Sequence, residues 1–141
     1  MSTLRPEWLD EVPGASELFD WFGYWPDFHD SEVLSIHLDR SGTSSVRVHA
    51  FDTTDKVDEK GYFVAQKHVI VSFLLENVLT CDLKWFNTQN AVFEIALVRT
   101  EDGFDLCLEY SHGVCGTITA GNVRIEMESG TPAAASINEG E

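Results

Sequence analysis

Apolar and polar residues alternate along most of the chain beyond residue 31, and this period of two limits the fold more than any other feature. The alternation first appears over residues 33–39 and resumes over residues 46–50, after the turn-forming residues 41–44. Successive side chains of a strand point to opposite faces, so the pattern predicts half-buried strands and not helices. We therefore expect a chain built mainly from β-hairpins.

The first two alternating segments predict a hairpin with a definite register. If Asp39 faces Arg47, opposite charges pair across the strands and apolar residues meet on the other face. The same register places His37 opposite His49. Facing side chains lie about 5 Å apart, so these two histidines are expected to be neighbours.

Further strands follow from the same pattern. Residues 53–61 predict a polar loop, and the later strands are expected at residues 62–75 with a break near 66–67, and at 78–86, 91–99, 104–110, 114–120 and 123–127. Asp102-Gly103 lies between two alternating segments and favours a tight hairpin turn of the primed type. His112-Gly113 predicts another turn.

One short helix precedes these strands. Residues 13–22 place Leu18, Trp21 and Phe22 at helical spacing, with Ser16 as the candidate N-cap, and Pro26 disfavours helix at the residue before it. One helix followed by many hairpins predicts an α+β protein dominated by antiparallel β-sheet. Whether that sheet curls or packs as a sandwich stays open.

The size of the chain suits one domain. A length of 141 residues with 43% hydrophobic content can bury a core without metal or disulfide support, so no cofactor is expected. We assign residues 1–128 to a single α+β domain. Residues 129–141 are small and polar, and they are expected to form a flexible tail.

Cysteine usage and hydropathy favour the cytoplasm. The three cysteines show no CxxC spacing, and any intramolecular disulfide would leave one thiol unpaired. The first residues have no apolar run behind a basic flank, and nowhere do about 18 uncharged apolar residues follow one another. Neither an export signal nor a membrane association is expected.

The charge is strongly unbalanced. Aspartate and glutamate number 24 against 9 lysines and arginines, which gives a formal net charge of −15. Such a surface repels the phosphates of nucleic acids and anionic lipids, so nucleic acid is not an expected partner. The excess of acids either keeps the protein soluble or provides a surface for a basic protein.

Histidines and carboxylates raise the alternative of a metal site. His29 and Asp30, together with His37 or His49, could serve a small metal-dependent hydrolase or a ligand-binding domain, since imidazole and carboxylate bind hydrolytic metals. The competing interpretation is structural. In it, the ring of His29 packs beside Trp25 and Phe28, while Asp30 accepts hydrogen bonds from backbone amides.

Two motifs carry a resemblance. They are Trp-Pro-Asp-Phe-His-Asp-Ser-Glu-Val at residues 25–33 and Phe-Asn-Thr-Gln-Asn-Ala at residues 86–91. With both in this order, residues 14–128 resemble the immunity protein 50 family of bacterial polymorphic toxin systems. The resemblance implies a small cytoplasmic α+β protein that binds a toxin domain and blocks it. It brings no catalytic residue, so the chain is expected not to be an enzyme.

Charge and resemblance together predict a non-catalytic immunity or inhibitor protein that binds a basic toxin domain through an acidic surface. The candidate contacts are Asp27, His29, Asp30, Glu32, Asp55, Asp58 and Glu59. The amides of residues 87–90 either shape a turn or meet a partner. A scaffold or oligomerisation module remains a further alternative if Trp21, Tyr24 and Trp25 form an exposed patch.

Overall fold

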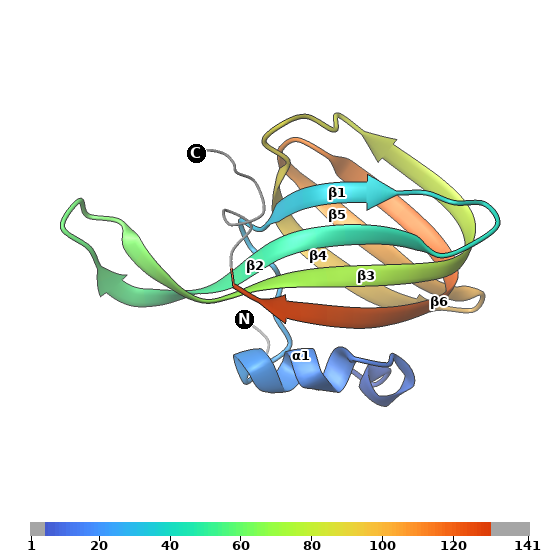
Figure 1. Ribbon diagram of the computed structural model, residues 1–141, viewed down its shortest axis with the longest axis horizontal. Coiled ribbons are helices and arrows are strands. Elements are labelled where there is room, and N and C mark those ends of the chain that lie inside the picture. The colour runs from blue at the N-terminus through green and yellow to red at the C-terminus, as the bar shows by residue number, and fades with distance from the viewer. Residues whose placement is uncertain (1–4, 131–141) are drawn as a thin grey trace.

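Six antiparallel strands close into a barrel in the computed structural model, which describes residues 5–130 (Figure 1). The strands are β1 (Glu32–His37), β2 (Ser44–Val57), β3 (Phe63–Lys84), β4 (Ala91–Thr100), β5 (Gly103–His112) and β6 (Cys115–Ser129). Around the ring their order is β1-β2-β3-β6-β5-β4. The predicted dominance of antiparallel sheet is confirmed, and the form that the sequence left open is a closed barrel.

The predicted helix forms beside the barrel. A 3-10 helix, η1 (Leu9–Glu11), leads into α1 (Ala15–Phe22), which lies against β6 (Figure 1). Gly14 and Gly23 bound α1 in left-handed backbone conformations, with φ of +87° and +86°. No side chain caps the helix, and Ser16 lies within its first turn, so the predicted Ser16 cap is wrong.

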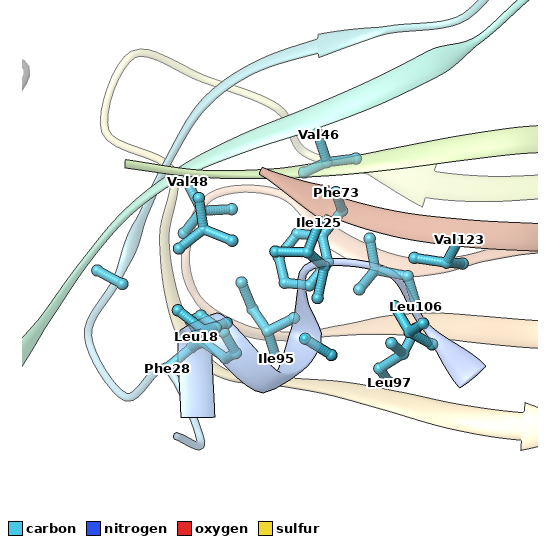
Figure 2. Packing of buried hydrophobic residues seen from close by; sticks show 14 of the residues in the cluster. Leu18, Phe28, Val46, Val48, Phe73, Ile95, Leu97, Leu106, Val123 and Ile125 are labelled. Carbon is cyan, nitrogen blue, oxygen red and sulfur yellow. The ribbon is translucent and has the colours of Figure 1, made fainter. Parts of the chain in front are cut away.

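Side chains fill the barrel. Alternate residues of each strand point inward, and an antiparallel barrel of this size leaves room for side chains only. Figure 2 shows these inward residues meeting Leu18 of α1 in one cluster. Fully buried members from the strands include Val46, Val48, Phe73 and Leu106. One continuous core therefore joins the helix to the sheet.

The predicted register of the first hairpin is wrong by four residues. His37 pairs with Ser45, and His49 pairs with Glu32 at the other end of β1. The connection lies two residues earlier than expected, because β1 ends at His37 and β2 already begins at Ser44, whose Oγ accepts the amide of Asp39 over 2.9 Å. His37 and His49 are consequently not neighbours.

Three strands are longer than predicted. β2 continues to Val57, so most of the predicted loop at residues 53–61 is strand. β3 runs unbroken from residue 63 to residue 84, and the expected break appears as a local distortion at Lys67, where φ is +56°. β6 is one strand where the sequence predicted two.

The turn at Asp102-Gly103 is tight, as predicted, but it is not of the primed type. Thr100 pairs with Gly103, so the turn consists of Glu101 and Asp102, and neither residue has a positive φ. Gly103 instead opens β5 with φ +148°. A Cβ on Gly103 would collide with the carbonyl of Ala120 on β6, which explains why glycine is needed there.

Beyond the barrel, β2 and β3 continue as a two-stranded hairpin, here called the arm (residues 52–66). Figure 1 shows the arm extending away from the ring of strands. β1 pairs with β2 only as far as His49, and the ladder between β3 and β6 begins at Val69. The tip is closed by a hydrogen bond of 2.8 Å from the amide of Asp58 to the carbonyl of Tyr62.

The chain ends lie largely outside the described range. Ser129 ends β6, whereas residues 131–141 of the predicted tail fall outside the described residues, as do residues 1–4. Within residues 5–130, no helix is long and apolar enough to cross a membrane.

Candidate functional site

The barrel is joined at one place by a loop and not by a strand ladder. β1 and β4 share a single residue pair, Glu32 with Ala91. The remainder of this joint is made by residues 27–33, here called the seam segment, which run along β4. Four backbone hydrogen bonds hold it there: Ile95 N to Asp27 O, Asp30 N to Val92 O, Val92 N to Ser31 O, and Val33 N to Asn90 O, at 2.9–3.1 Å.

The first resemblance motif owes much of its composition to this joint. Phe28 adopts a φ of +62°, an uncommon conformation for a bulky residue, and its side chain is buried. Its ring meets Phe73 inside the barrel with centroids 5.6 Å apart (Figure 2). Asp27 and His29, on either side, are exposed. The seam segment thus anchors one ring inward and presents two polar side chains outward.

His29 and Asp30 are not arranged as predicted. His29 Nδ1 lies 3.0 Å from the carbonyl oxygen of Phe93, and the His29 ring packs edge-on against the Phe93 ring with centroids 5.2 Å apart. The predicted packing of His29 beside Trp25 and Phe28 is therefore wrong. The carboxylate of Asp30 is exposed and lies 3.4 Å from His29 Nε2, instead of accepting from backbone amides.

A pocket of about 490 Å³ opens beside the seam segment, between β2 and β4. We call it the seam pocket. Its aromatic walls are Trp8, Tyr24, Trp25, Phe28 and Phe51, and its carboxylates are Asp27, Asp52 and Glu94. Among the described residues, no lysine or arginine lines it. The volume is in the usual range for ligand sites, and the charge is negative.

Hydrogen bonds fix the polar wall of the pocket. Tyr24 Oη donates to Asp52 Oδ1 over 2.6 Å, and Gln66 Nε2 donates to Asp52 Oδ2 over 3.1 Å. Burial raises the pKa of Tyr24, and the bond to Asp52 and the charges of Asp52 and Asp27 raise it further. The phenol therefore stays neutral at physiological pH.

A chain of three polar side chains lies where the arm leaves the barrel. Glu32 Oε1 is 3.1 Å from His49 Nδ1, and His49 Nε2 is 3.0 Å from His68 Nδ1. The hydrogen bond with His49 lowers the pKa of Glu32. Burial, aided by the charge that His49 can carry, lowers the pKa of His68.

The predicted metal ligands do not converge. His37 faces Ser45, and His49 uses both ring nitrogens for its bonds to Glu32 and His68. His29 contacts Asp30 at a separate place on the seam segment. Over residues 5–130, no group of three or more His, Cys, Asp or Glu side chains is arranged so that it could hold a metal ion. The geometry thus does not assemble the site of the predicted hydrolase alternative.

The amide-rich motif is explained by turn chemistry. Asn87 Oδ1 accepts the amides of Gln89 and Asn90, both over 2.8 Å. In return, Asn90 Oδ1 accepts the amides of Asn87 and Val114. Asn90 is 3% exposed. This motif therefore shapes the turn between β3 and β4, as the structural interpretation predicted.

The remaining predicted contacts lie on the arm. Asp58 and Glu59 are exposed at its tip, where Asp58 Oδ1 accepts the amides of Lys60 and Tyr62. Asp55 belongs to β2, and its side chain is outside what the structure describes. The predicted residues thus form two groups, one on the seam segment and one on the arm.

Sequence reasoning missed most of the residues that line the seam pocket. Trp8, Asp52 and Glu94 come from three distant segments, and only the closure of the barrel brings them together. The proposed patch of Trp21, Tyr24 and Trp25 is not exposed as such, because all three rings are partly buried against the core. Among the side chains that the structure describes, the most exposed aromatic ones are instead Tyr62, Trp85, Phe86 and Tyr110.

Searches with the sequence and the fold give no match to a protein-family model, to a curated protein or to a solved structure. The resemblance to the immunity protein 50 family therefore stays a prediction from two short motifs.

Proposed function

We propose that this chain is a non-catalytic cytoplasmic inhibitor of the immunity type, which binds a basic toxin domain through the arm and the adjoining seam segment. The two resemblance motifs and the formal charge of −15 support the class of partner. The arm supports the mode of binding, and it is the observation on which the proposal depends.

The arm carries large apolar side chains that have no core beneath them. Val57 is 56% exposed, Tyr62 68% and Val64 39%. Exposed aliphatic and aromatic groups bordered by acids, here Asp58 and Glu59, are typical of the anchors that dominate protein interfaces. A two-stranded ribbon made only to connect β2 and β3 would have no need of them.

The backbone of the arm is also available. Among residues 5–130, no third strand pairs with the outer edge of β2 beyond Ala50 or with that of β3 before His68. Open strand edges can accept an extended segment of another chain by strand addition. A partner can therefore gain both main-chain hydrogen bonds and apolar contacts on the arm.

Most of the negative charge is left unneutralised. In the described part of the chain, arginine pairs with only four carboxylates, those of Asp10, Glu11, Glu76 and Glu126. Unpaired charge of one sign speeds the encounter with a partner of opposite charge and makes it salt-dependent. Such a surface favours a basic partner over an acidic one.

The test uses the toxin domain encoded beside this gene. We expect the double variant V57S/Y62S to bind this domain about 30-fold or more weakly than wild type, because two central apolar contacts are lost. The matched control is V98S/Y110S, whose side chains are 47% and 57% exposed on the barrel. It should stay within about threefold of wild type.

Calorimetry gives the affinities, and survival of cells that express the toxin domain gives the activity. Association should slow by about tenfold or more between low salt and about 0.5 M salt. Full toxin activity in the presence of excess wild-type protein would show the proposal to be wrong. Equal losses in the two double variants would remove the arm as the binding site.

A further inference from the structure

The seam pocket is a half-open recess whose inner walls are continuous with the core. Its walls are ring faces and edges, with Trp8 perpendicular to Trp25 at a centroid distance of 5.0 Å and Phe28 beyond. A joint that only had to close the barrel would be close-packed, as protein interiors are. The walls leave about 490 Å³ open.

Three carboxylates from three segments face this space: Asp27 from the seam segment, Asp52 from β2 and Glu94 from β4. Asp27 and Asp52 both act on Tyr24, whose pKa they raise. Asp52 is held by Tyr24 and Gln66, whereas no side-chain donor among residues 5–130 reaches Glu94. Negative charge is thus spread around an aromatic recess.

The aromatic rings and carboxylates of the pocket together favour a planar cation as its ligand. Cations are attracted to ring faces, and among side-chain cations the guanidinium group is planar, weakly hydrated and able to stack while it donates to carboxylates. The chain itself cannot supply one from its undescribed ends, because residues 1–4 and 131–141 contain no lysine or arginine. Arg5 is engaged by Asp10 over 2.7 Å and lies over the Phe19 ring.

We propose that the seam pocket binds a guanidinium group, stacked among Tyr24, Trp25 and Phe51 and paired with Asp27 and Glu94. The source is an arginine side chain of a partner or a free guanidinium compound. The inference rests on the proposed function only where it names the partner as that source. The pocket would then recognise a basic partner by the planar shape of its guanidinium group as well as by its charge.

The first experiment tests whether the pocket prefers a guanidinium group to a neutral group of the same shape. Wild-type protein labelled with ¹⁵N is titrated with n-butylguanidinium and, as a neutral compound of the same shape, with n-butylurea. We expect saturable shifts of the Trp8 and Trp25 indole signals with butylguanidinium, with a Kd on the order of 1–10 mM for so small a ligand. The Trp85 indole, which does not line the pocket, should stay in place. Equal shifts with butylurea, or none with either compound, would overturn the proposal.

The second experiment tests whether the carboxylates of Asp27 and Glu94 bind the guanidinium group. D27N and E94Q keep the shape of each side chain, and an asparagine at position 27 can still accept the amide of residue 29, as Asp27 Oδ1 does over 3.0 Å. Each should weaken butylguanidinium binding about two- to fivefold, as expected for one half-exposed charge pair. E101Q, at the exposed turn between β4 and β5, is the control and should have no effect. Unchanged binding in both pocket variants would contradict the assignment.

The third experiment separates the two sources. The blocked peptide acetyl-Gly-Arg-Gly-amide is titrated in the same way. Binding at least about fivefold tighter than butylguanidinium supports a partner's arginine, because the peptide backbone adds contacts at the rim. Weaker binding supports a free guanidinium compound. Failure of the arm variants to affect toxin binding would leave this result standing, so the two proposals can fail separately.

Discussion

The barrel and the arm are made from the same two strands, yet different forces hold them. Within the barrel, Val46 and Val48 of β2 are fully buried, whereas Val57 on the arm is more than half exposed. In the barrel, burial of apolar surface stabilises the strands, while in the arm mainly the local ladder and turn do. One pair of strands is thus buried by the core over one part of its length and exposed over the other.

The largest expected effect is the loss of stability on truncating a core side chain of the barrel, compared with an equal truncation on the arm. Phe73 is 1% exposed and meets Phe28 at the joint, so Phe73→Ala should lower the free energy of unfolding by about 3–5 kcal/mol. Tyr62→Ala, an equally large truncation on the arm, should change it by less than about 0.5 kcal/mol. Urea unfolding measures both, and similar losses would mean that the arm packs like the core.

A pair of glycines sharpens the comparison. Gly14, next to β6, has φ +87°, and Gly61, at the tip of the arm, has φ +88°. A Cβ on Gly14 would collide with the carbonyl of Ile125, whereas one on Gly61 would meet nothing within 4 Å. Both alanine variants share the cost of a left-handed backbone, about 1–2 kcal/mol.

Gly14→Ala adds the collision to that cost, so we expect a loss of about 3 kcal/mol or more in the free energy of unfolding. For Gly61→Ala, the free energy of unfolding should fall only by the cost of the left-handed backbone conformation. Thermal unfolding of the two variants side by side tests this difference. Equal losses would mean that β6 moves away from the helix at little cost.

The smallest effect lies at the boundary between the two regions, where His68 and Glu32 flank His49. Because the pKa of His68 is lowered on folding, the folded state takes up that proton less readily, and stability falls as the pH drops below about 6.5, its ordinary value. The pKa of Glu32 is also lowered, so its contribution is present above the ordinary value and lost as the pH falls through the folded one.

Glu32 is half exposed and His68 is partly exposed, so solvent screening should keep each step below about 0.5 kcal/mol. An NMR titration of the His68 ring measures the shift directly, and His49→Gln should move the His68 pKa back toward its ordinary value. Titration of wild-type His68 above pH 6.5 would contradict this account.

The alternation in the sequence was enough to predict strands but not to pair them correctly. A register shifted by four residues leaves every side chain on the same face, so the pairing of His37 with His49 satisfied the pattern as well as the true pairing with Ser45 does. The choice depends on the conformation of the connection, in which Ser44 accepts the amide of Asp39. Period-two reasoning contains no information about that connection.

Breaks in the pattern were mistaken for ends of strands. Lys67 and Asn77 have positive φ, and the ladder register shifts near both residues while β3 continues as one strand. Gly121, within β6, faces Asn77 across the ladder, and a Cβ there would lie 3.0 Å from Asn77 Nδ2. Curved strands are needed to close a barrel, and residues that permit bends look like turns in a sequence.

The candidate site was predictable only in part. Asp27 and His29 were chosen from the motif and do line the seam pocket, whereas Glu94 and Trp8 joined them only through the fold. His37 carried the wrong expectation because its neighbour depended on the register. Residues close in sequence can be grouped from composition, but a pocket assembled from three segments requires the closed ring.

The joint between β1 and β4 has a mechanical consequence. With one ladder pair and four backbone hydrogen bonds, it is the shortest connection in the ring, so we expect the ring to open there first. The Asp27 and Glu94 carboxylates lie on opposite sides of that joint. A bound group that contacts both carboxylates would hold the joint closed. A protease that cuts only the opened ring would then cleave the protein with an occupied pocket more slowly than the protein with an empty one.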